Sequence, residues 1–457
     1  MTLYTKETLA LCRLAGPLVL ASLVFMAMSV TDVVMMSWLG RTALAAGAAT
    51  SDLQSIAFYL MAGIVAAVAP LVSHARGAGD SRAIERVTRQ GFWAAALVGL
   101  PGAALVWSAA LVLQQIGVDA AIAALAAPYA HTLAFAFVPM LGVMVCHHYL
   151  SAHQRTRLLL AAATLALPLN ALANYALMFG YLGMPALGLA GAGVASAIAA
   201  AVMFAFMLGC LIRDQRARGY RLFDRFLTPD WPGFREILCI GLPIGILSLG
   251  EVGAALLSTV VMGVFGADAL AAHAVALRCA GVIYALPLGL AHAATIRIGY
   301  FAGSGDHDAV ACTAKTALWL ALLVGCAYLA IINAASGAIA QALLGTGDPA
   351  TPVVYQAALF LGVLAAYQPL LCAGTVLSGV LRGVKETRTP MMISLVSIWG
   401  IGGATAVALI VLFDTGALAL WLGLAAGAAT FGLGMLGYFT RLWRKQGTLR
   451  MAMAAET

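Results

Sequence analysis

Charged residues are scarce in this sequence: Asp, Glu, Lys and Arg make up only 9% of its 457 residues. A soluble globular protein has about 25%, so the composition excludes an ordinary soluble fold. The eight cysteines include no C-x-x-C pair, and nearly all lie in apolar stretches, which favours reduced packing residues over disulfides or a zinc site. H-E-x-x-H, phosphate-loop and nucleophile-elbow motifs are also absent, so common enzyme signatures are missing.

Hydrophobic residues, by contrast, account for 63% of the chain and are gathered in long runs between short polar turns. A membrane-spanning helix needs about 20 mostly apolar residues, and the runs are long enough for twelve spans. We therefore expect an all-α membrane protein with twelve transmembrane helices. The expected spans lie near residues 12–38, 47–74, 90–115, 120–150, 157–179, 186–212, 237–264, 269–298, 311–342, 352–380, 390–413 and 416–440.

The positive charges sort onto alternate loops. With a cytoplasmic N-terminus, all 25 Lys and Arg except Arg41 and Arg278 fall on the termini and the even-numbered loops. Because cytoplasmic loops collect Lys and Arg, we expect a multi-pass protein with both termini in the cytoplasm. The polar leader contains Glu7 and no cleavage site follows it, so the first helix is expected to be retained. The basic residues are expected to contact membrane lipids and no nucleic acid, since no aromatic residues interleave with them.

The sequence contains an internal repeat, which is typical of transporters. The paired positions are Pro17 and Pro243, Gly40 and Gly266, and Asp80 and Asp306 at a displacement of 226 (243 − 17), then Thr156 and Thr387 at 231 (387 − 156). The repeat predicts two pseudo-symmetric six-helix lobes. Residues 1–212 form the N-terminal six-helix lobe, 213–235 a basic cytoplasmic linker, and 236–457 the C-terminal six-helix lobe with a short basic tail.

Two carboxylates lie within expected helices: Asp32 in the outer half of the first and Glu251 near the middle of the seventh. A charge in hydrocarbon costs about 2.5–3.5 kcal/mol even on insertion scales, so such residues usually face a cavity and serve ion or proton traffic. For Glu251 the alternative is a structural ion pair with Arg278 in the next helix.

Asn170 and Asn174 are four residues apart and share one face of the expected fifth helix. Amide oxygens together with a carboxylate suit a hard cation such as Na⁺, whereas one desolvated carboxyl group can instead carry H⁺. On spacing alone, polar packing between helices is the simpler interpretation of the two asparagines.

Together these residues resemble the multidrug and toxic compound extrusion family, and in particular its bacterial NorM-like branch. The resemblance covers almost the whole chain, and the order and spacing of its motifs are specific. The motifs are Thr31-Asp32, Trp38-Leu39-Gly40, Ala45-Ala46, Asn170 and Asn174 before Phe179-Gly180, Gly188-Leu-Ala-Gly191, Gly241-Leu-Pro243-Ile-Gly245 before Glu251, Gly303-x-Gly305-Asp306, Leu381-Arg-Gly and Thr387-Arg388-Thr-Pro390. The resemblance implies two pseudo-symmetric six-helix lobes around a central cavity and alternating access in the bacterial inner membrane. It also implies export of bulky, often cationic organic compounds in exchange for Na⁺ or H⁺.

The resemblance also implies a coupling-cation site in the first lobe, built from an acidic residue of the first helix, asparagines of the fifth and a hydroxyl of the sixth. The matching residues are Asp32, Asn170, Asn174 and Ser196. This set is complete, so we place coupling here and favour H⁺. Na⁺ stays open as an ion held by Asp32, Asn170 and Asn174, and no other metal site is expected.

In the second lobe the family pattern has a glutamate, a tyrosine and an aspartate. The first two match Glu251 and Tyr367, whereas the aspartate position holds Leu371. Losing one of two carboxylates removes a formal charge from a cation site and favours a neutral or singly protonated partner. We therefore assign Glu251, Tyr367 and Arg278 to the substrate cavity or to a second-lobe cation.

We expect a monomeric secondary active transporter for small drug-like molecules, with no cofactor apart from the coupling ion and no enzyme activity. A flippase or exporter of lipid-linked or other metabolites is the first alternative. It should line its cavity with several Arg or Lys, whereas the membrane interior has only Arg278. An intramembrane enzyme is the second alternative, suggested by Gly77-Ala-Gly79-Asp80. It is disfavoured because Asp80 lies in an expected loop and recurs as Asp306.

Overall fold

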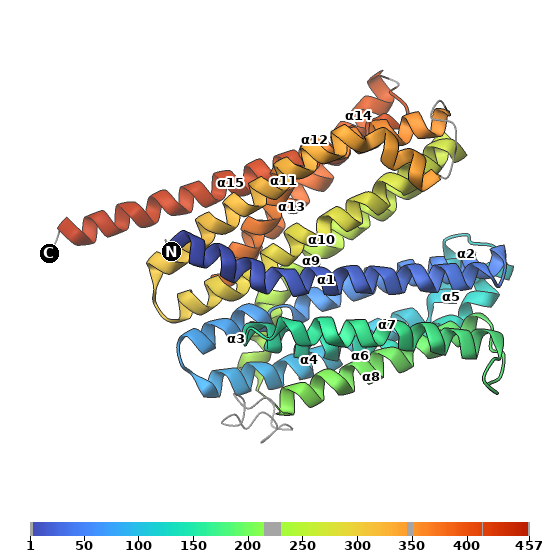
Figure 1. Cartoon of the computed structure of the whole chain (residues 1–457), viewed down its shortest axis with the longest axis horizontal. Helices are drawn as coiled ribbons and strands as arrows, with labels where there is room; N and C mark the ends of the chain where they lie inside the picture. The colour runs from blue at the N-terminus through green and yellow to red at the C-terminus, as the bar shows by residue number, and fades with distance from the viewer. Residues whose placement is uncertain (1–2, 214–229, 345–350, 414, 456–457) are drawn as a thin grey trace. The chain divides into compact units, whose positions relative to one another are not determined.

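The computed structural model of the chain describes residues 3–213, 230–344, 351–413 and 415–455, and helices dominate them (Figure 1). The elements are α1(Leu3–Ser37), α2(Arg41–Val65), α3(Val68–Gly77), α4(Ser81–Trp107), α5(Ala109–Gln115), α6(Ala120–Ala152), α7(Thr156–Phe179), α8(Leu189–Arg213), α9(Trp231–Met262), η2(Gly263–Phe265), α10(Ala267–Gly303), α11(His307–Leu344), α12(Pro352–Gly383), α13(Arg388–Leu395), η3(Val396–Gly402), α14(Gly403–Phe413) and α15(Leu418–Ala455).

Twelve of the described helical stretches are long and apolar enough to cross a membrane, which confirms the expected all-α membrane fold. Most of the helices are longer than the apolar runs that predict them. The first begins at Leu3 rather than near residue 12, because the polar turn around Lys6 and Glu7 continues the helix without adding apolar residues. The second candidate span, Arg41–Gly77, is interrupted between α2 and α3.

The repeat is visible in the backbone. Gly40 and Gly266, which are 226 residues apart, have φ angles of 104° and 101° and each precedes the second helix of its half. Gln154 and Lys385, which are 231 residues apart, have φ angles of 62° and 65°. Residues with a side chain rarely adopt this left-handed conformation. Its recurrence at equivalent positions shows that the two halves use the same turn geometry.

The backbone contacts divide the chain into two compact units. We call residues 13–249 with 299–306 the N-unit, and residues 1–12, 250–298 and 307–457 the C-unit. Each unit thus includes short helix ends from the other half of the sequence. Residues 214–229, most of the expected linker 213–235, lie outside the described residues.

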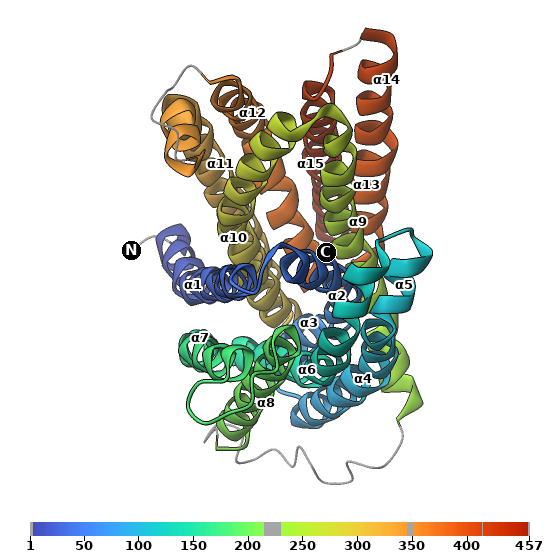
Figure 2. The same ribbon diagram turned by 90° about the vertical axis from the view of Figure 1, so that its right-hand side faces the viewer.

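In the N-unit, α6 is the central helix and contacts α2, α4 and α8, while α7 packs on α8 (Figures 1 and 2). The buried core of the N-unit contains the large side chains of Phe137, Leu141 and Tyr149, all on α6. Small residues permit the close helix contacts. A side chain at Gly193 of α8, for example, would collide with Thr132 and Tyr129 of α6. Small residues at helix interfaces are the usual way in which membrane helices pack.

In the C-unit, α12 lies between α11 and α15, and α14 packs on α15 (Figure 2). A hydrogen bond joins α10 to α12: the hydroxyl of Thr295 on α10 donates to the carbonyl of Gly379 on α12 at 2.8 Å. Gly379 has no room for a side chain, because a Cβ there would collide with the backbone of Ala291.

The beginning of α1 is bound to the C-unit by a buried ion pair. Arg297 donates from Nε to Glu7 Oε2 at 2.8 Å and from Nη2 to Glu7 Oε1 at 2.5 Å. The hydroxyl of Thr313 donates a third hydrogen bond to Glu7 at 3.0 Å. Glu7 is only 6% exposed, and a buried carboxylate needs such complete pairing because its desolvation is costly.

The start of α9 is fixed within the N-unit. Asp230 accepts a hydrogen bond of 3.1 Å from the backbone N–H of Gly233 and forms a two-fold ion pair with Arg86 of α4. The hydrogen bond from the Arg86 guanidinium is the main reason why the pKa of Asp230 is lowered from its ordinary value. Asp230 is therefore both the cap of α9 and its link to α4.

Replacing Gly379 by Ala should destabilise the protein by about 1–3 kcal/mol, because the added Cβ forces α10 and α12 apart. Gly437→Ala is the matched control, since no atom lies within 4 Å of the added Cβ. Thermal unfolding midpoints of the two detergent-solubilised variants would be compared with wild type. Equal midpoints for both variants would contradict the close α10–α12 contact.

Replacing Asp230 by Asn should destabilise the protein at pH 7 by about 1 kcal/mol, since it weakens a helix cap and an ion pair. A carboxylate with a lowered folded-state pKa stabilises above its unfolded-state pKa, and this stabilisation is lost as the pH falls through the folded-state pKa. The difference between variant and wild type should therefore shrink below about pH 4. Unfolding midpoints would be measured from pH 7 to the acid limit of the wild type. A pH-independent difference would exclude the Arg86 pair as its cause.

Candidate functional site

The N-unit brings three of the four predicted first-lobe residues together. Asp32 lies on α1, and Asn170 and Asn174 lie one turn apart on α7. Asn174 donates from Nδ2 to Asp32 Oδ1 at 2.6 Å and to Asn170 Oδ1 at 3.2 Å. Both asparagines are almost completely buried. The spacing of four residues therefore does place both amides on one face, next to the carboxylate.

This cluster has hydrogen-bonding capacity left over. Asn170 Nδ2 and Asn174 Oδ1 are buried and have no hydrogen-bond partner among the described residues. Buried polar atoms are normally paired, so an unused donor and an unused acceptor beside a carboxylate mark a place where an ion or a water can bind. The oxygens available to a hard cation are those of Asp32, Asn170 and Asn174.

Two further residues, which the sequence did not single out, adjoin the cluster. Tyr129 of α6 interacts electrostatically with Asp32, and its hydroxyl lies 3.1 Å from the hydroxyl of Ser51 on α2. Four helices of the N-unit thus contribute to the surroundings of Asp32. Ser196 lies on α8 and is half-buried, but the hydrogen bonds found among the described residues do not join it to this cluster.

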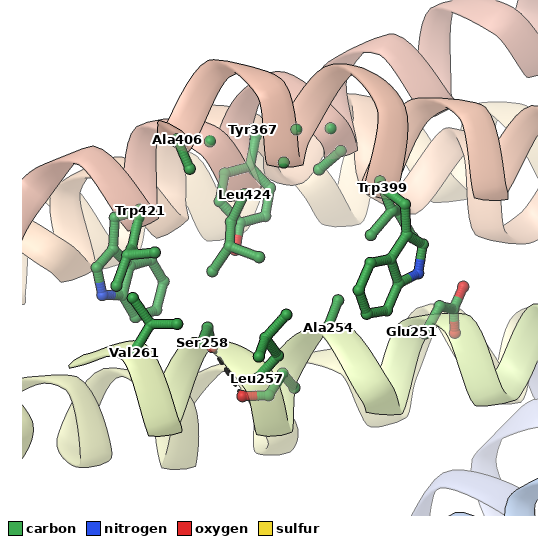
Figure 3. A pocket seen from close by; sticks show the side chains of 18 of the residues that line it. Glu251, Ala254, Leu257, Ser258, Val261, Tyr367, Trp399, Ala406, Trp421 and Leu424 are labelled. Atoms are coloured by element: carbon green, nitrogen blue, oxygen red, sulfur yellow. Dashed lines mark hydrogen bonds between the residues drawn. The ribbon is translucent and has the colours of Figure 1, made fainter. Parts of the chain in front are cut away.

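The C-unit contains a cavity of about 370 Å³ (Figure 3). Its walls come from α9, α10, α12, η3, α14 and α15 and are mainly apolar. Of the predicted second-lobe residues, Glu251 and Tyr367 line it, together with Leu371 at the position of the family aspartate. Glu251 is the only carboxylic acid among the described lining residues.

Glu251 has two partners in the C-unit that sequence reasoning missed. The hydroxyl of Tyr284, on α10, donates a hydrogen bond of 3.1 Å to Oε2 of Glu251. Arg382, in the last turn of α12, interacts electrostatically with the same carboxylate. Arg278 has an exposed side chain and is not among the residues that line the cavity. The positively charged side chain near Glu251 is therefore that of Arg382 in the tenth span, α12, and not that of Arg278 in the eighth span, α10.

The far end of the cavity is formed by a different polar group. Ser258 and Trp421 line it, opposite Glu251 and Trp399 in Figure 3. Behind Ser258 lies His273, whose Nε2 is 3.4 Å from the Ser258 hydroxyl and whose ring packs edge-on against Trp421. The described residues contain no group of three or more His, Cys, Asp or Glu that could hold a metal ion.

Twelve apolar spans in two related halves, with carboxylates within the spans that face a polar cluster and a cavity, define a multi-pass membrane transporter. The MatE family model matches residues 17–176 and 243–408, one segment in each half. The chain belongs to the MatE family and is a transporter rather than an enzyme. The family resemblance of the sequence motifs is thereby confirmed.

Close relatives extend over nearly the full chain. This chain is 34% identical over 434 residues to the probable multidrug resistance protein NorM of Mesorhizobium japonicum, and the match covers 93% of this chain and 92% of the relative. It is 34% identical over 459 residues to the probable multidrug resistance protein NorM of Brucella suis, covering 98% and 95%.

Solved structures support the fold. The eukaryotic MATE transporter AtDTX14 superposes with a TM-score of 0.86 at 21% identity, covering 97% of this chain and 98% of that one. An outward-facing multidrug resistance MATE family transporter of the MOP superfamily superposes with a TM-score of 0.85 at 19% identity, covering 96% of each chain.

Proposed function

We propose that this protein exports bulky, cationic organic compounds in exchange for a cation that binds at Asp32, with H⁺ favoured over Na⁺. The observation that carries the proposal is the Asp32–Asn174–Asn170 cluster, which joins α1 to α7. The NorM relatives named as probable multidrug resistance proteins support the substrate class.

The cluster suits coupling because cation binding changes its hydrogen bonds. An ionised Asp32 accepts the hydrogen bond from Asn174, whereas a proton or Na⁺ on the carboxylate competes with that bond. The competition alters how α1 packs on α7. A cation drives alternating access only if it binds one conformation more tightly than the other, and a helix contact that depends on the cation provides such a difference.

A single proton is the better match to the side chains present. The first-lobe cluster has one carboxylate and neutral amides, and the cavity of the C-unit has Glu251 with Leu371 where a second acid would stand. One carboxyl group suffices to carry H⁺. Na⁺ would have to rely on amide oxygens and water for most of its coordination.

The distribution of positive charges along the chain supports the proposed topology. Lys and Arg gather on the termini and the even-numbered loops, which favours a bacterial inner-membrane protein with both termini in the cytoplasm. The two lobes of residues 1–212 and 236–457 would then move as the alternating parts of a monomer.

The flippase alternative is disfavoured, since the described lining of the C-unit cavity has no Lys or Arg that could bind an anionic head group.

Asp32→Asn should lower the rate of export at least about tenfold, because the variant has no carboxylate to take up the cation. Efflux of ethidium would be measured in proteoliposomes with an imposed pH gradient or an imposed Na⁺ gradient. Asp119→Asn is the matched control, since Asp119 is a helix cap outside the spans. We expect export by wild type and Asp119→Asn with the pH gradient alone. Export that requires Na⁺ would contradict H⁺ coupling, and no export with either gradient would contradict the proposed function.

Leu371→Asp should create a Na⁺ site in the C-unit, because it adds a second carboxylate to the cavity that Glu251 lines. A ligand that binds only the folded state raises its stability, by about 2.7 kcal/mol at one hundred times the dissociation constant. The unfolding midpoint of the variant should rise when choline chloride is replaced by NaCl, and that of Leu371→Asn should not. Equal shifts in both variants would contradict a carboxylate-dependent site.

A further inference from the structure

One turn of the eleventh span is wider than an α-helix. Between α13 and α14 the chain forms η3, a π-helical segment from Val396 to Gly402. Such turns are rare and are frequently found at functional sites. Three residues of η3 line the C-unit cavity, namely Ile398, Trp399 and Gly402.

The wide turn is held in place by glycines. A Cβ at Gly402 would lie 2.9 Å from the carbonyl oxygen of Gly423 and 3.2 Å from the Cα of Gly427, both on α15. Only residues without a side chain allow backbones to approach so closely. The contact fixes where η3 sits against α15, and therefore where its side chains point.

Trp399 is oriented by a hydrogen bond as well as by packing. Its indole Nε1 donates to the carbonyl of Gly250 at 3.2 Å, and the ring lies over Gly253, whose Cβ would be in ordinary contact at 3.4 Å. The two glycines are three residues apart on one face of α9 and leave space for the flat ring. The side chain of Trp399 is nevertheless 43% exposed, so part of the ring is open to a ligand.

Glu251 directly follows Gly250 in α9 and carries the next polar side chain near Trp399. Figure 3 shows Trp399 and Glu251 side by side at one end of the cavity. Tyr284 donates to Oε2, whereas Oε1 accepts no hydrogen bond from the described residues. Glu251, which also interacts electrostatically with Arg382, therefore keeps one carboxylate oxygen without a hydrogen-bond donor among the described residues, at the same end of a mainly apolar cavity as the indole of Trp399.

We propose that Trp399 is a specificity-determining residue that binds the aromatic body of a planar, singly charged organic cation whose positive charge is neutralised by Glu251. The inference rests on the proposed function, because it assigns a substrate class to a cavity of the proposed exporter. The cavity of about 370 Å³ lies near the lower end of the range of about 300–1,000 Å³ for ligand pockets. It accommodates one small drug-sized molecule. Tryptophan is also the side chain with the strongest attraction for a cation over its ring.

The test measures binding without any ion gradient. Ethidium, a planar monocation, and phenanthridine, the uncharged ring system on which it is built, would be titrated onto purified protein in detergent at neutral pH. The variants are Trp399→Leu, Trp399→Phe and Glu251→Gln. Trp319→Leu is the matched control, since Trp319 is 73% exposed on α11 and is not among the lining residues.

Trp399→Leu should weaken ethidium binding about tenfold, which is within the range for a cation over an aromatic ring. Trp399→Phe keeps an aromatic face and should stay within about threefold of wild type. Glu251→Gln should weaken ethidium binding at least about tenfold and leave phenanthridine binding unchanged, because only the charged ligand needs the carboxylate. Trp319→Leu should bind both ligands like wild type. If Trp399→Leu is not monodisperse, Trp399→Met replaces it.

Two results would overturn the inference. Equal loss of ethidium affinity in Trp399→Leu and Trp399→Phe would show that the hydrogen bond to Gly250 matters and not the aromatic face. Wild-type affinity in Trp399→Leu would exclude contact with the ligand. Failure of the proposed function is distinguishable, since a wild-type protein that binds ethidium as expected but exports nothing with either gradient keeps this binding site and loses the antiport.

Discussion

A polar group inside a bilayer has to find its partner in the protein, because hydrocarbon offers none. Many hydroxyls in the described spans meet this requirement locally: Thr50, Ser55 and Thr88 each donate to the carbonyl four residues earlier in their own helix. Carboxylates cannot do so, since they need donors. Asp32 therefore reaches Asn174 on another helix, and Glu251 reaches Tyr284. The spare capacity that remains at these groups locates the chemistry of the protein.

The two halves use one backbone design for different chemistry. Their turns have the same unusual geometry, at Gly40 and Gly266 and again at Gln154 and Lys385. The polar groups differ. The N-unit surrounds its carboxylate with amides and hydroxyls, which in the proposed function suits a small cation. In the C-unit, Glu251 has Tyr284 and Arg382 as polar neighbours and lines a mainly apolar cavity, which in the proposed function suits an organic cation. A repeated fold thus allows a division of tasks between ion and substrate.

Much of the architecture follows from one-dimensional patterns. Run length and hydropathy give the twelve spans, because each helix must bury its own backbone. The spacing of Asn170 and Asn174 gives their common face. Helix ends do not follow in this way: the buried pairing of Glu7 at the start of α1 depends on Arg297 and Thr313, which are 290 and 306 residues away in the chain. Tyr129, Tyr284 and Arg382 escape sequence reasoning for the same reason, as their roles depend on which helices are neighbours.

The π-helical segment has a consequence for how members of such a family diverge. A π turn holds one residue more than the α-helical turn that would replace it, so η3 absorbs an extra residue without displacing α13 or α14. Deleting one residue between Val396 and Gly402 would let the turn close into an α-helix. Residues on one side of the deletion would then rotate by about 100° relative to those on the other, and the indole of Trp399 would lose its place over α9. Evolution can therefore change what such a chamber accepts by altering the length of one turn, with every residue that lines the chamber left intact.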